Sequence, residues 1–267
     1  MSLLDDIKNL REKTGAGMAD CKKAVEEAQG NIEQALEILR KKGIAKAAKR
    51  GDRETSEGII VSYVLDDKTE GGILEMNAET DFVARNEKFI KMSNDVLEVV
   101  KKNKPKDLDD LLNMKMGDLN VRESLDSLSG TIGEKMVIKN FAILEGASVA
   151  SYSHMNGQKG VLVALDKEGK SELAYDIAMQ VAATDPKYLS PEDVPEEEIA
   201  KEKEIYKEQL LKEGKPENIL DKIMEGKINK YFEEVCLLKQ EYIKDDKKKV
   251  EDVLGDVKII KFVRYSL

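Results

Sequence analysis

The sequence predicts an α+β fold with four parts. These are three N-terminal helices, two similar subdomains that each combine a small antiparallel sheet with helices, and an inserted antiparallel coiled-coil hairpin. Three observations lead to this prediction: the hydrophobic spacing is helical over residues 2–42, strand-like after Gly58, and helical with dense charge over about 191–236. With 267 residues, 41% of them hydrophobic, the chain can form several small cores.

The composition narrows the class of protein. The formal net charge of -9 argues against binding nucleic acid through net charge. Cys21 and Cys236 form no CxxC motif, which argues against a disulfide framework or a zinc ribbon and suits a reducing cytosol. The N-terminus lacks the pattern of a signal peptide, and no apolar run approaches the ~18 residues of a membrane span. We therefore expect a cytoplasmic protein.

Residues 2–42 are predicted to form three short helices around one small core. Ser2 and Asp5 have the spacing of a capping box, and Asn31 can cap the third helix. The predicted buried positions recur at helical steps: Leu3, Ile7, Leu10, Met18, Cys21, Val25, Ala28, Ile32, Ala35, Leu36 and Leu39. A core of this size is marginal alone, so we expect the module to dock on another part of the protein.

The basic segment 40–53 has two interpretations. It holds one acid, Asp52, and seven basic residues: Arg40, Lys41, Lys42, Lys46, Lys49, Arg50 and Arg53. The segment could bind a nucleic acid or the ribosome. Alternatively, it is a helix C-terminus, where cations suit the helix dipole, that leads into a solvated linker. We favour the linker on the residues alone.

The first subdomain begins with a hairpin signal, in which "GIIVSYVLDD" and "GGILEMNAE" are joined by "DDKTEGG". A helix should follow, with Phe89, Met92, Val96 and Val100 on one side, and then a helix over about 118–135 and a strand in "KMVIKNFAILEG".

The second subdomain repeats this order. Residues 61–76 align with 150–165, with Ser62-Tyr63 at Ser151-Tyr152 and Gly72 at Gly160, and one residue of slack in the turn. Further elements are predicted as a helix over 171–184, a helix over 247–254 and a strand over 256–265. Two rounds of β-β-α-α-β predict two similar subdomains.

The insertion at about 191–236 is predicted to be a helical hairpin. Gly214-Lys215-Pro216 ends one helix and begins the next, and each arm of about 20 residues would be ~30 Å long. Narrow apolar stripes predict an antiparallel coiled coil, which serves either as a solvated strut or as an arm for dimerisation or partner contact. The predicted domains are 1–52 (helices and basic linker), 53–146 (first subdomain), 147–190 with 237–267 (second subdomain), and 191–236 (hairpin).

No pattern in the chain indicates catalysis. His154 is the single histidine, and "SYSHMNG" holds no acid or nucleophile pattern around it. "GAGMAD" lacks the Lys-Ser/Thr of a phosphate-binding loop and follows a helix instead of a strand. We expect no enzymatic activity, no cofactor and no metal of the protein's own.

The segment "NAETDFVARNEKF" (77–89) has two interpretations. Phe82 is one of five Phe in a chain without Trp, and it follows Asp81 where a strand is predicted to end. It could contact a partner, or it could anchor the next helix on the sheet. The residues alone favour the anchor.

Three segments resemble the elongation factor Ts family. They are "LREKTGAGMADCKKAVEEAQGNIEQALEILRKKGIAKAAK" (10–49), "ILEMNAETDFVARNEKF" (73–89) and "PEDV…KEGKPENILDKIMEGKINKYFEEV" (191–235), and together they span nearly the whole chain in order. The resemblance implies a ubiquitin-associated-like N-terminal domain. It also implies a guanine-nucleotide exchange factor that binds the GDP form of elongation factor Tu, speeds GDP release and lets GTP enter.

The resemblance also implies the binding residues. Thr80, Asp81, Phe82 and Val83 match the family element that intrudes near the partner's magnesium site, which reverses the preference for Phe82 as an anchor. Arg11 and Met18 match contacts to the partner's nucleotide-binding domain, and His154 matches a contact to another partner domain. Ala19 stands where many members have a second Met, and some members continue beyond the final strand that ends here at Leu267. Ala19 is expected to thin its contact with the partner, and the contact made by a C-terminal extension is not assumed.

Two questions stay open from the sequence. A ribosome- or RNA-binding protein that uses 40–53 is the rival function. The protein could also form a homodimer, or a heterotetramer with the partner.

Overall fold

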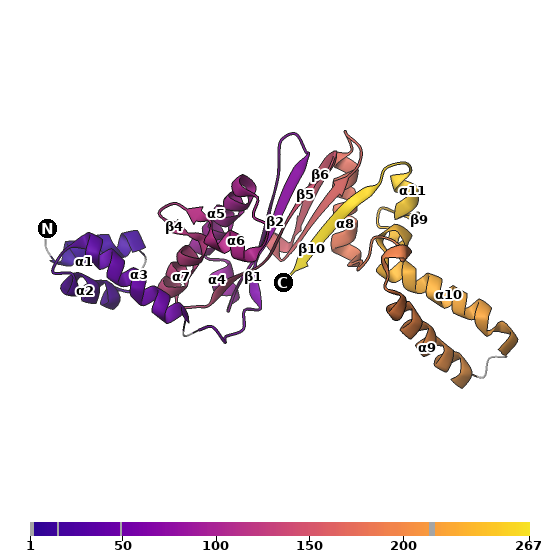
Figure 1. Cartoon of the computed structure of the whole chain (residues 1–267), viewed down its shortest axis with the longest axis horizontal. Helices are drawn as coiled ribbons and strands as arrows, with labels where there is room; N and C mark the ends of the chain where they lie inside the picture. Colours follow the sequence, from indigo (N-terminus) through magenta and orange to yellow (C-terminus); the bar gives the residue numbers. More distant parts are fainter. Residues whose placement is uncertain (1–2, 15, 49, 214–216) are drawn as a thin grey trace.

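The computed structural model describes residues 3–14, 16–48, 50–213 and 217–267. The three N-terminal helices lie at one end of an elongated molecule, two sheets lie at its centre, and a pair of helices projects from the other end (Figure 1). The predictions for Ser2, Lys49 and 214–216 fall outside the described residues. Among the residues that the structure describes, none of the helices has the length and hydropathy of a membrane span.

The N-terminal module consists of α1 (Leu3–Thr14), α2 (Met18–Glu27) and α3 (Ile32–Ala48). The predicted core is confirmed at Leu10, Cys21 and Val25, which are fully buried together. It is wrong at Leu3 and Met18, which are 50% and 45% exposed because each lies at the first residue of its helix, outside the cluster. The predicted cap is also confirmed, since the Asn31 side chain accepts a hydrogen bond from the N–H of Gln34 at 3.1 Å. Helix α3 runs six residues beyond the predicted end at 42.

The extension of α3 packs against α7 (Val121–Ile132), so the module docks on the core as expected. The two helices cross at Gly43 and Gly130. A Cβ atom built on Gly130 would lie 2.3 Å from the Cα of Gly43, so only glycine permits this approach. The guanidinium of Arg40 pairs with Glu123 at 2.7 Å beside the crossing.

Replacing Gly130 by alanine is expected to destabilise the protein by about 1–3 kcal/mol, because the new methyl group meets backbone that cannot rotate away. Urea unfolding measures this change. Gly226→Ala is the matched control: Gly226 lies in α10 (Glu217–Val235) with open space around it, so alanine there should add up to ~1 kcal/mol of helix stability. A gain in stability at both glycines would contradict the close crossing.

The first sheet has the antiparallel order β1-β2-β5, from β1 (Glu57–Val64), β2 (Glu70–Ala78) and β5 (Met136–Glu145). Helices α5 (Glu87–Asn103) and α7 cover one face of it. Phe89, Val96 and Val100 of α5 are fully buried, as predicted.

The helix expected over 118–135 is shorter than predicted. A small helix and a two-stranded hairpin, absent from the sequence prediction, precede it: α6 (Leu108–Asn113), β3 (Lys115–Met116) and β4 (Leu119–Asn120). Asn120 forms a capping box with Glu123, so the helix begins only at Val121.

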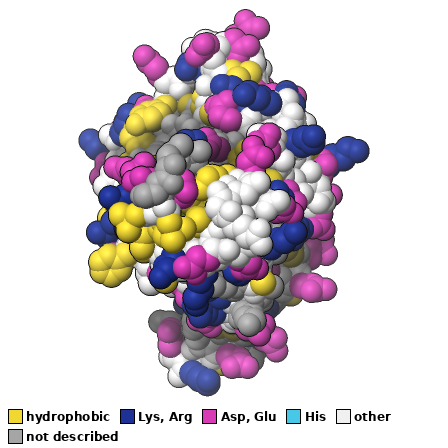
Figure 2. All heavy atoms as spheres, turned by 90° about the vertical axis from the view of Figure 1, so that its left-hand side faces the viewer, with side chains coloured by type: hydrophobic (Ala, Val, Ile, Leu, Met, Phe, Trp, Pro, Cys, Tyr) yellow, Lys and Arg dark blue, Asp and Glu magenta, His cyan; other side chains and the backbone are white. Residues whose placement is uncertain are grey.

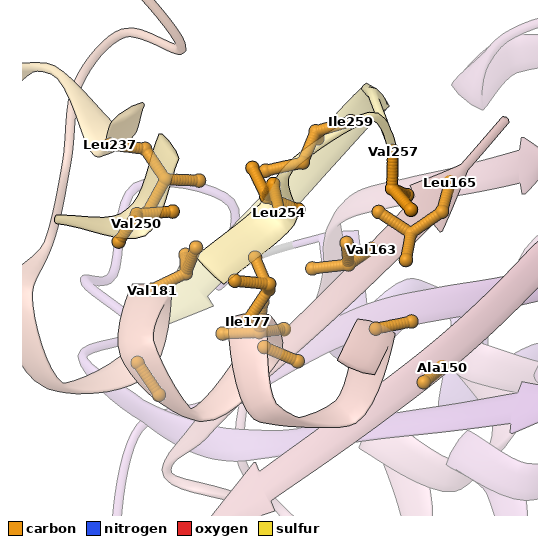
Figure 3. Packing of buried hydrophobic residues seen from close by; sticks show 14 residues of the cluster. Ala150, Val163, Leu165, Ile177, Val181, Leu237, Val250, Leu254, Val257 and Ile259 are labelled. Atoms are coloured by element: carbon orange, nitrogen blue, oxygen red, sulfur yellow. The ribbon is translucent and has the colours of Figure 1, made fainter. Parts of the chain in front are cut away.

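The second sheet has the antiparallel order β6-β7-β10, from β6 (Ser148–His154), β7 (Lys159–Leu165) and β10 (Ile259–Ser266). Helix α8 (Ser171–Thr184) begins and ends where predicted and packs Ile177 and Val181 toward Val163 and Leu254 (Figure 3).

The helix predicted over 247–254 is partly wrong. Residues Asp245–Lys249 form β9, which pairs with β8 (Glu241–Tyr242), and α11 spans only Val250–Leu254. The run "DDKKK" has no apolar side chain to bury in a helix, whereas Val250 and Leu254 enter the core.

The two sheets pack face to face. Ile60, Ile73 and Leu144 of the first sheet meet Val149 and Leu162 of the second, which makes four layers of helices, sheet, sheet and helices. Phe89 lies in a separate cluster under α4 (Asp81–Ala84) with Met76 and Val83.

When the two hairpins are matched by their strand pairing, their second strands align one residue away from the alignment made on the sequence. Tyr63 lies opposite Gly72, and Tyr152 lies opposite Val161, so Gly71 and not Gly72 has the place of Gly160. The expected slack in the turn is therefore absent.

The projecting helices are α9 (Glu196–Lys212) and α10, which lie side by side (Figure 1). At their base the Glu198 carboxylate accepts hydrogen bonds from the hydroxyl groups of Tyr188, at 2.6 Å, and Tyr231. These two hydroxyl groups lower the pKa of Glu198. Three short 3-10 turns complete the described elements: Met155–Gly157, Pro191–Asp193 and Leu237–Lys239.

Candidate partner-binding site

Residues 80–83 form a short turn between β2 and α5, and this turn presents Phe82 to solvent. Thr80 is the N-cap of α4, and its side-chain oxygen accepts a hydrogen bond from the N–H of Val83 at 3.4 Å. Val83 is buried with Phe89 in the cluster below, whereas Phe82 is 83% exposed. The interpretation of Phe82 as the helix anchor is therefore wrong, and Val83 and Phe89 have that role.

The other members of the predicted element differ in exposure. Asp81 is partly exposed and pairs with Arg85 one helical turn later, at 3.2 Å. Thr80 is half-buried with its hydroxyl bonded within the chain, and Val83 is buried, whereas Phe82 is exposed and Asp81 partly so. An exposed Phe beside an exposed ion pair is typical of a contact surface because aromatic side chains dominate interface energy.

Two shallow depressions flank this turn. On one side, Asp81 and Arg85 line a depression together with Met155 and Asn156. On the other side, Lys88 of α5 shares a depression with two predicted contact residues, Arg11 and Met18. The structure thus places three segments that are far apart in sequence around the 81–88 region.

Exposed apolar side chains lie on all three segments. Besides Phe82, these are Met18, which is 45% exposed, and Met155, which is 62% exposed. Figure 2 views the molecule from its N-terminal end and shows several groups of exposed hydrophobic side chains with charged side chains between and around them. Exposed apolar side chains with charged ones around them are suited to binding another protein.

His154 is exposed but does not line either depression. Its Nδ1 atom lies 3.0 Å from the hydroxyl of Tyr152, and the two rings stack at 5.9 Å. Tyr152 in turn meets the ring of Tyr175 edge to face at 5.7 Å, so His154 belongs to an aromatic group beside α8.

Sequence reasoning missed Met155, the neighbour of His154. Met155, Asn156 and Gly157 have successive φ angles of 50°, 55° and 90°, a conformation that Gly adopts readily and Met does not. Gly157 packs against Ile59, which fixes the turn to the first sheet. The Asn-Gly pair in "HMNG" is a turn signal, and it could have indicated that Met155 is exposed.

The basic segment is largely paired within the chain. Lys41 pairs with Glu37, Lys42 with Glu27, and Arg53 with Glu79. Arg40 pairs with Glu123, and Arg50 donates a hydrogen bond to the carbonyl of Ser129 at 3.0 Å. Five of the seven basic side chains are therefore engaged; the Lys46 side chain and Lys49 lie outside the described part.

The groups that could perform chemistry are dispersed. Across the described ranges, no group of three or more His, Cys, Asp or Glu could hold a metal. Both cysteines are buried, and burial raises the pKa of Cys21 and that of Cys236, the latter to about 11.

An exposed aromatic tip on a two-sheet core, with a shallow depression of mixed polar and apolar lining on each side, is typical of a protein-binding factor. The family model described as Elongation factor TS matches residues 79–267. The chain belongs to the elongation factor Ts family, and its role is that of a translation elongation factor.

Curated relatives match almost the whole chain. Elongation factor Ts of Chlorobaculum tepidum is 46% identical, over 98% of this chain and 97% of the relative. Elongation factor Ts of Clostridium perfringens strain SM101 is 45% identical over 97% and 91%, and that of Nautilia profundicola 44% identical over 98% and 91%.

Proposed function

We propose that this protein is the guanine-nucleotide exchange factor for elongation factor Tu. It binds the GDP form of the partner, promotes GDP release and lets GTP enter, with no cofactor and no covalent chemistry of its own. The observation that carries the proposal is the 83% exposure of Phe82 within the family's "TDFV" element. A cytoplasmic location is part of the proposal.

The proposed mechanism is intrusion of the Phe82 tip near the partner's magnesium and phosphate site. Magnesium requires near-ideal octahedral geometry with oxygen ligands at about 2.0–2.1 Å, so a small displacement of its surroundings weakens its binding. Phe82 supplies the apolar contact that a hydrophobic gap accepts. Asp81 supplies a carboxylate that can leave Arg85 and perturb the water and side chains around the partner's ion.

Exchange then follows from reciprocal coupling. The factor holds a partner conformation with a distorted phosphate site, and nucleotide prefers the undistorted conformation. Each ligand therefore weakens the binding of the other by the same factor. A coupling of several kcal/mol is required, because about 1.4 kcal/mol changes an affinity tenfold.

The flanking segments extend the contact. Arg11 and Met18 are proposed to meet the partner's nucleotide-binding domain, and His154 to meet another partner domain. Thr80 and Val83 are proposed to support the tip without contacting the partner, because Val83 is buried and Thr80 caps α4. The depressions beside Lys88 and beside Met155 support one continuous binding face.

The remaining architecture is also inferred. The shared strand orders, β1-β2-β5 and β6-β7-β10, support two duplicated subdomains, at 53–146 and at 147–190 with 237–267. The paired helices α9 and α10 support a coiled-coil insertion at 191–236. Residues 1–52 form the ubiquitin-associated-like domain and its linker.

The experiment that tests the function is release of labelled GDP from elongation factor Tu. We expect the rate to rise with the concentration of this protein and then to saturate. The rival, binding of RNA through 40–53, predicts an affinity that falls steeply with salt and survives loss of Phe82. The pairing of five of its basic side chains disfavours the rival. An unchanged GDP release rate at saturating protein would overturn the proposed function.

A further inference from the structure

The side chain of Glu134 binds the residue that caps the Phe82 tip. Its Oε2 accepts a hydrogen bond from the N–H of Thr80 at 3.0 Å, and its Oε1 accepts one from the Thr80 hydroxyl at 2.8 Å. The same hydroxyl oxygen accepts from the N–H of Val83. A chain of hydrogen bonds thus runs from Glu134 into the first turn of α4.

A second set of bonds ties the same strand end to the linker that follows α3. The carboxylate of Glu79 accepts from the N–H of Lys135 at 2.6 Å and from the guanidinium of Arg53 at 3.1 Å. The ammonium of Lys135 donates to the carbonyl oxygens of Gly51, at 2.6 Å, and Arg53, at 2.8 Å. The loop after α7 therefore holds both the linker and the two residues that precede the tip.

The direction of Phe82 depends on this support. Helix α4 has four residues, too few to be stable alone. Phe82 itself is 83% exposed, so its own packing does little to fix its position. What orients it is the backbone of α4, which is held by Val83 and Ala84 on the core side and by Thr80 at the N-cap.

We propose that Glu134 is a positioning residue for the Phe82 tip. By binding both polar groups of Thr80, it restricts the motion of α4 and keeps Phe82 in the outward orientation before the partner arrives. A preorganised tip loses less conformational freedom on binding. The role in exchange rests on the proposed function, whereas the ordering of the tip does not.

The first experiment needs no partner. Because the chain has no Trp, Phe82→Trp introduces a single indole at the tip. In this background, Glu134→Ala should lower the residual fluorescence anisotropy of the indole, and Glu134→Asp should restore part of it. Glu54→Gln is the control. Glu54 lies exposed on the linker, so this substitution removes one negative charge, as Glu134→Ala does, at a position away from the tip. Equal anisotropy in the Glu134 variants and the control would overturn the proposal.

The second experiment measures GDP release from the partner. Glu134→Ala should slow the stimulated rate, measured with factor below its half-maximal concentration, by about threefold to tenfold, a cost typical of one newly mobile side chain. In the Phe82→Ala background, the same change should have no further effect. An equal slowing in both backgrounds would indicate a structural role only and overturn positioning.

The two experiments separate the two proposals. If the unmodified protein does not stimulate GDP release, the proposed function fails, and the anisotropy still decides whether Glu134 orders the tip. If it does stimulate release, both the anisotropy and the double-variant comparison must agree for positioning to stand.

Discussion

Phe82→Ala is expected to slow stimulated GDP release by about 30-fold or more, because truncating a central aromatic contact typically costs at least ~2 kcal/mol of binding. The ring is 83% exposed in the free protein, so nearly all of its contact energy is available to the partner. The measurement is the rate of labelled GDP release at factor concentrations below the half-maximal one, where lost binding energy lowers the rate directly, with the maximal rate at saturating factor recorded separately.

The stability of Phe82→Ala should remain within about 0.5 kcal/mol of the unmodified protein, because a surface substitution away from caps and cores rarely costs more. Phe82→Leu should retain part of the rate, since it keeps an apolar side chain. A normal release rate in a folded Phe82→Ala variant would exclude the tip as the intruding element.

Phe89→Ala, unlike Phe82→Ala, is expected to destabilise the protein, by about 3–5 kcal/mol. Phe89 is fully buried and packs with Met76, Val83 and Met136 beneath the tip. Its removal leaves a cavity that the helix and sheet around it fill only in part. Urea unfolding measures the loss, with Phe82→Ala as the matched control of the same residue type seven positions away.

A small destabilisation by Phe89→Ala, of less than about 1 kcal/mol, would contradict the packing of α5 on the first sheet. Because Val83 shares the Phe89 cluster, the variant should also slow GDP release at temperatures where it is still folded. The pair of substitutions therefore separates the residue that contacts the partner from the residue that supports it.

The long amphipathic elements could be predicted from the sequence. Helices α5 and α8 follow their hydrophobic spacing because each has a sheet on one side and solvent on the other. The short elements could not. Strands β3 and β4 have only two residues each, and β9 has no apolar residue, so their pairing depends on neighbouring turns and caps.

The candidate site, too, could be predicted from the sequence only in part. The residue types in "TDFV" identified the segment through a family resemblance, and that resemblance is supported by the family model and the curated relatives. The periodicity around Phe82 did not distinguish an anchor from a tip. Four-residue helices carry too little pattern, and the buried faces of Val83 and Phe89 decided the question.

By itself, the sequence determined the helical and strand periodicities, the family and the segment that carries the tip, because these depend on residues close together in the chain. Only the packing of the elements placed Phe82 in solvent, brought Glu134 to Thr80 across 54 positions, and paired Arg40 with Glu123 and Arg53 with Glu79. The physical reason is that these contacts join distant segments, and their formation depends on how the helices and sheets pack.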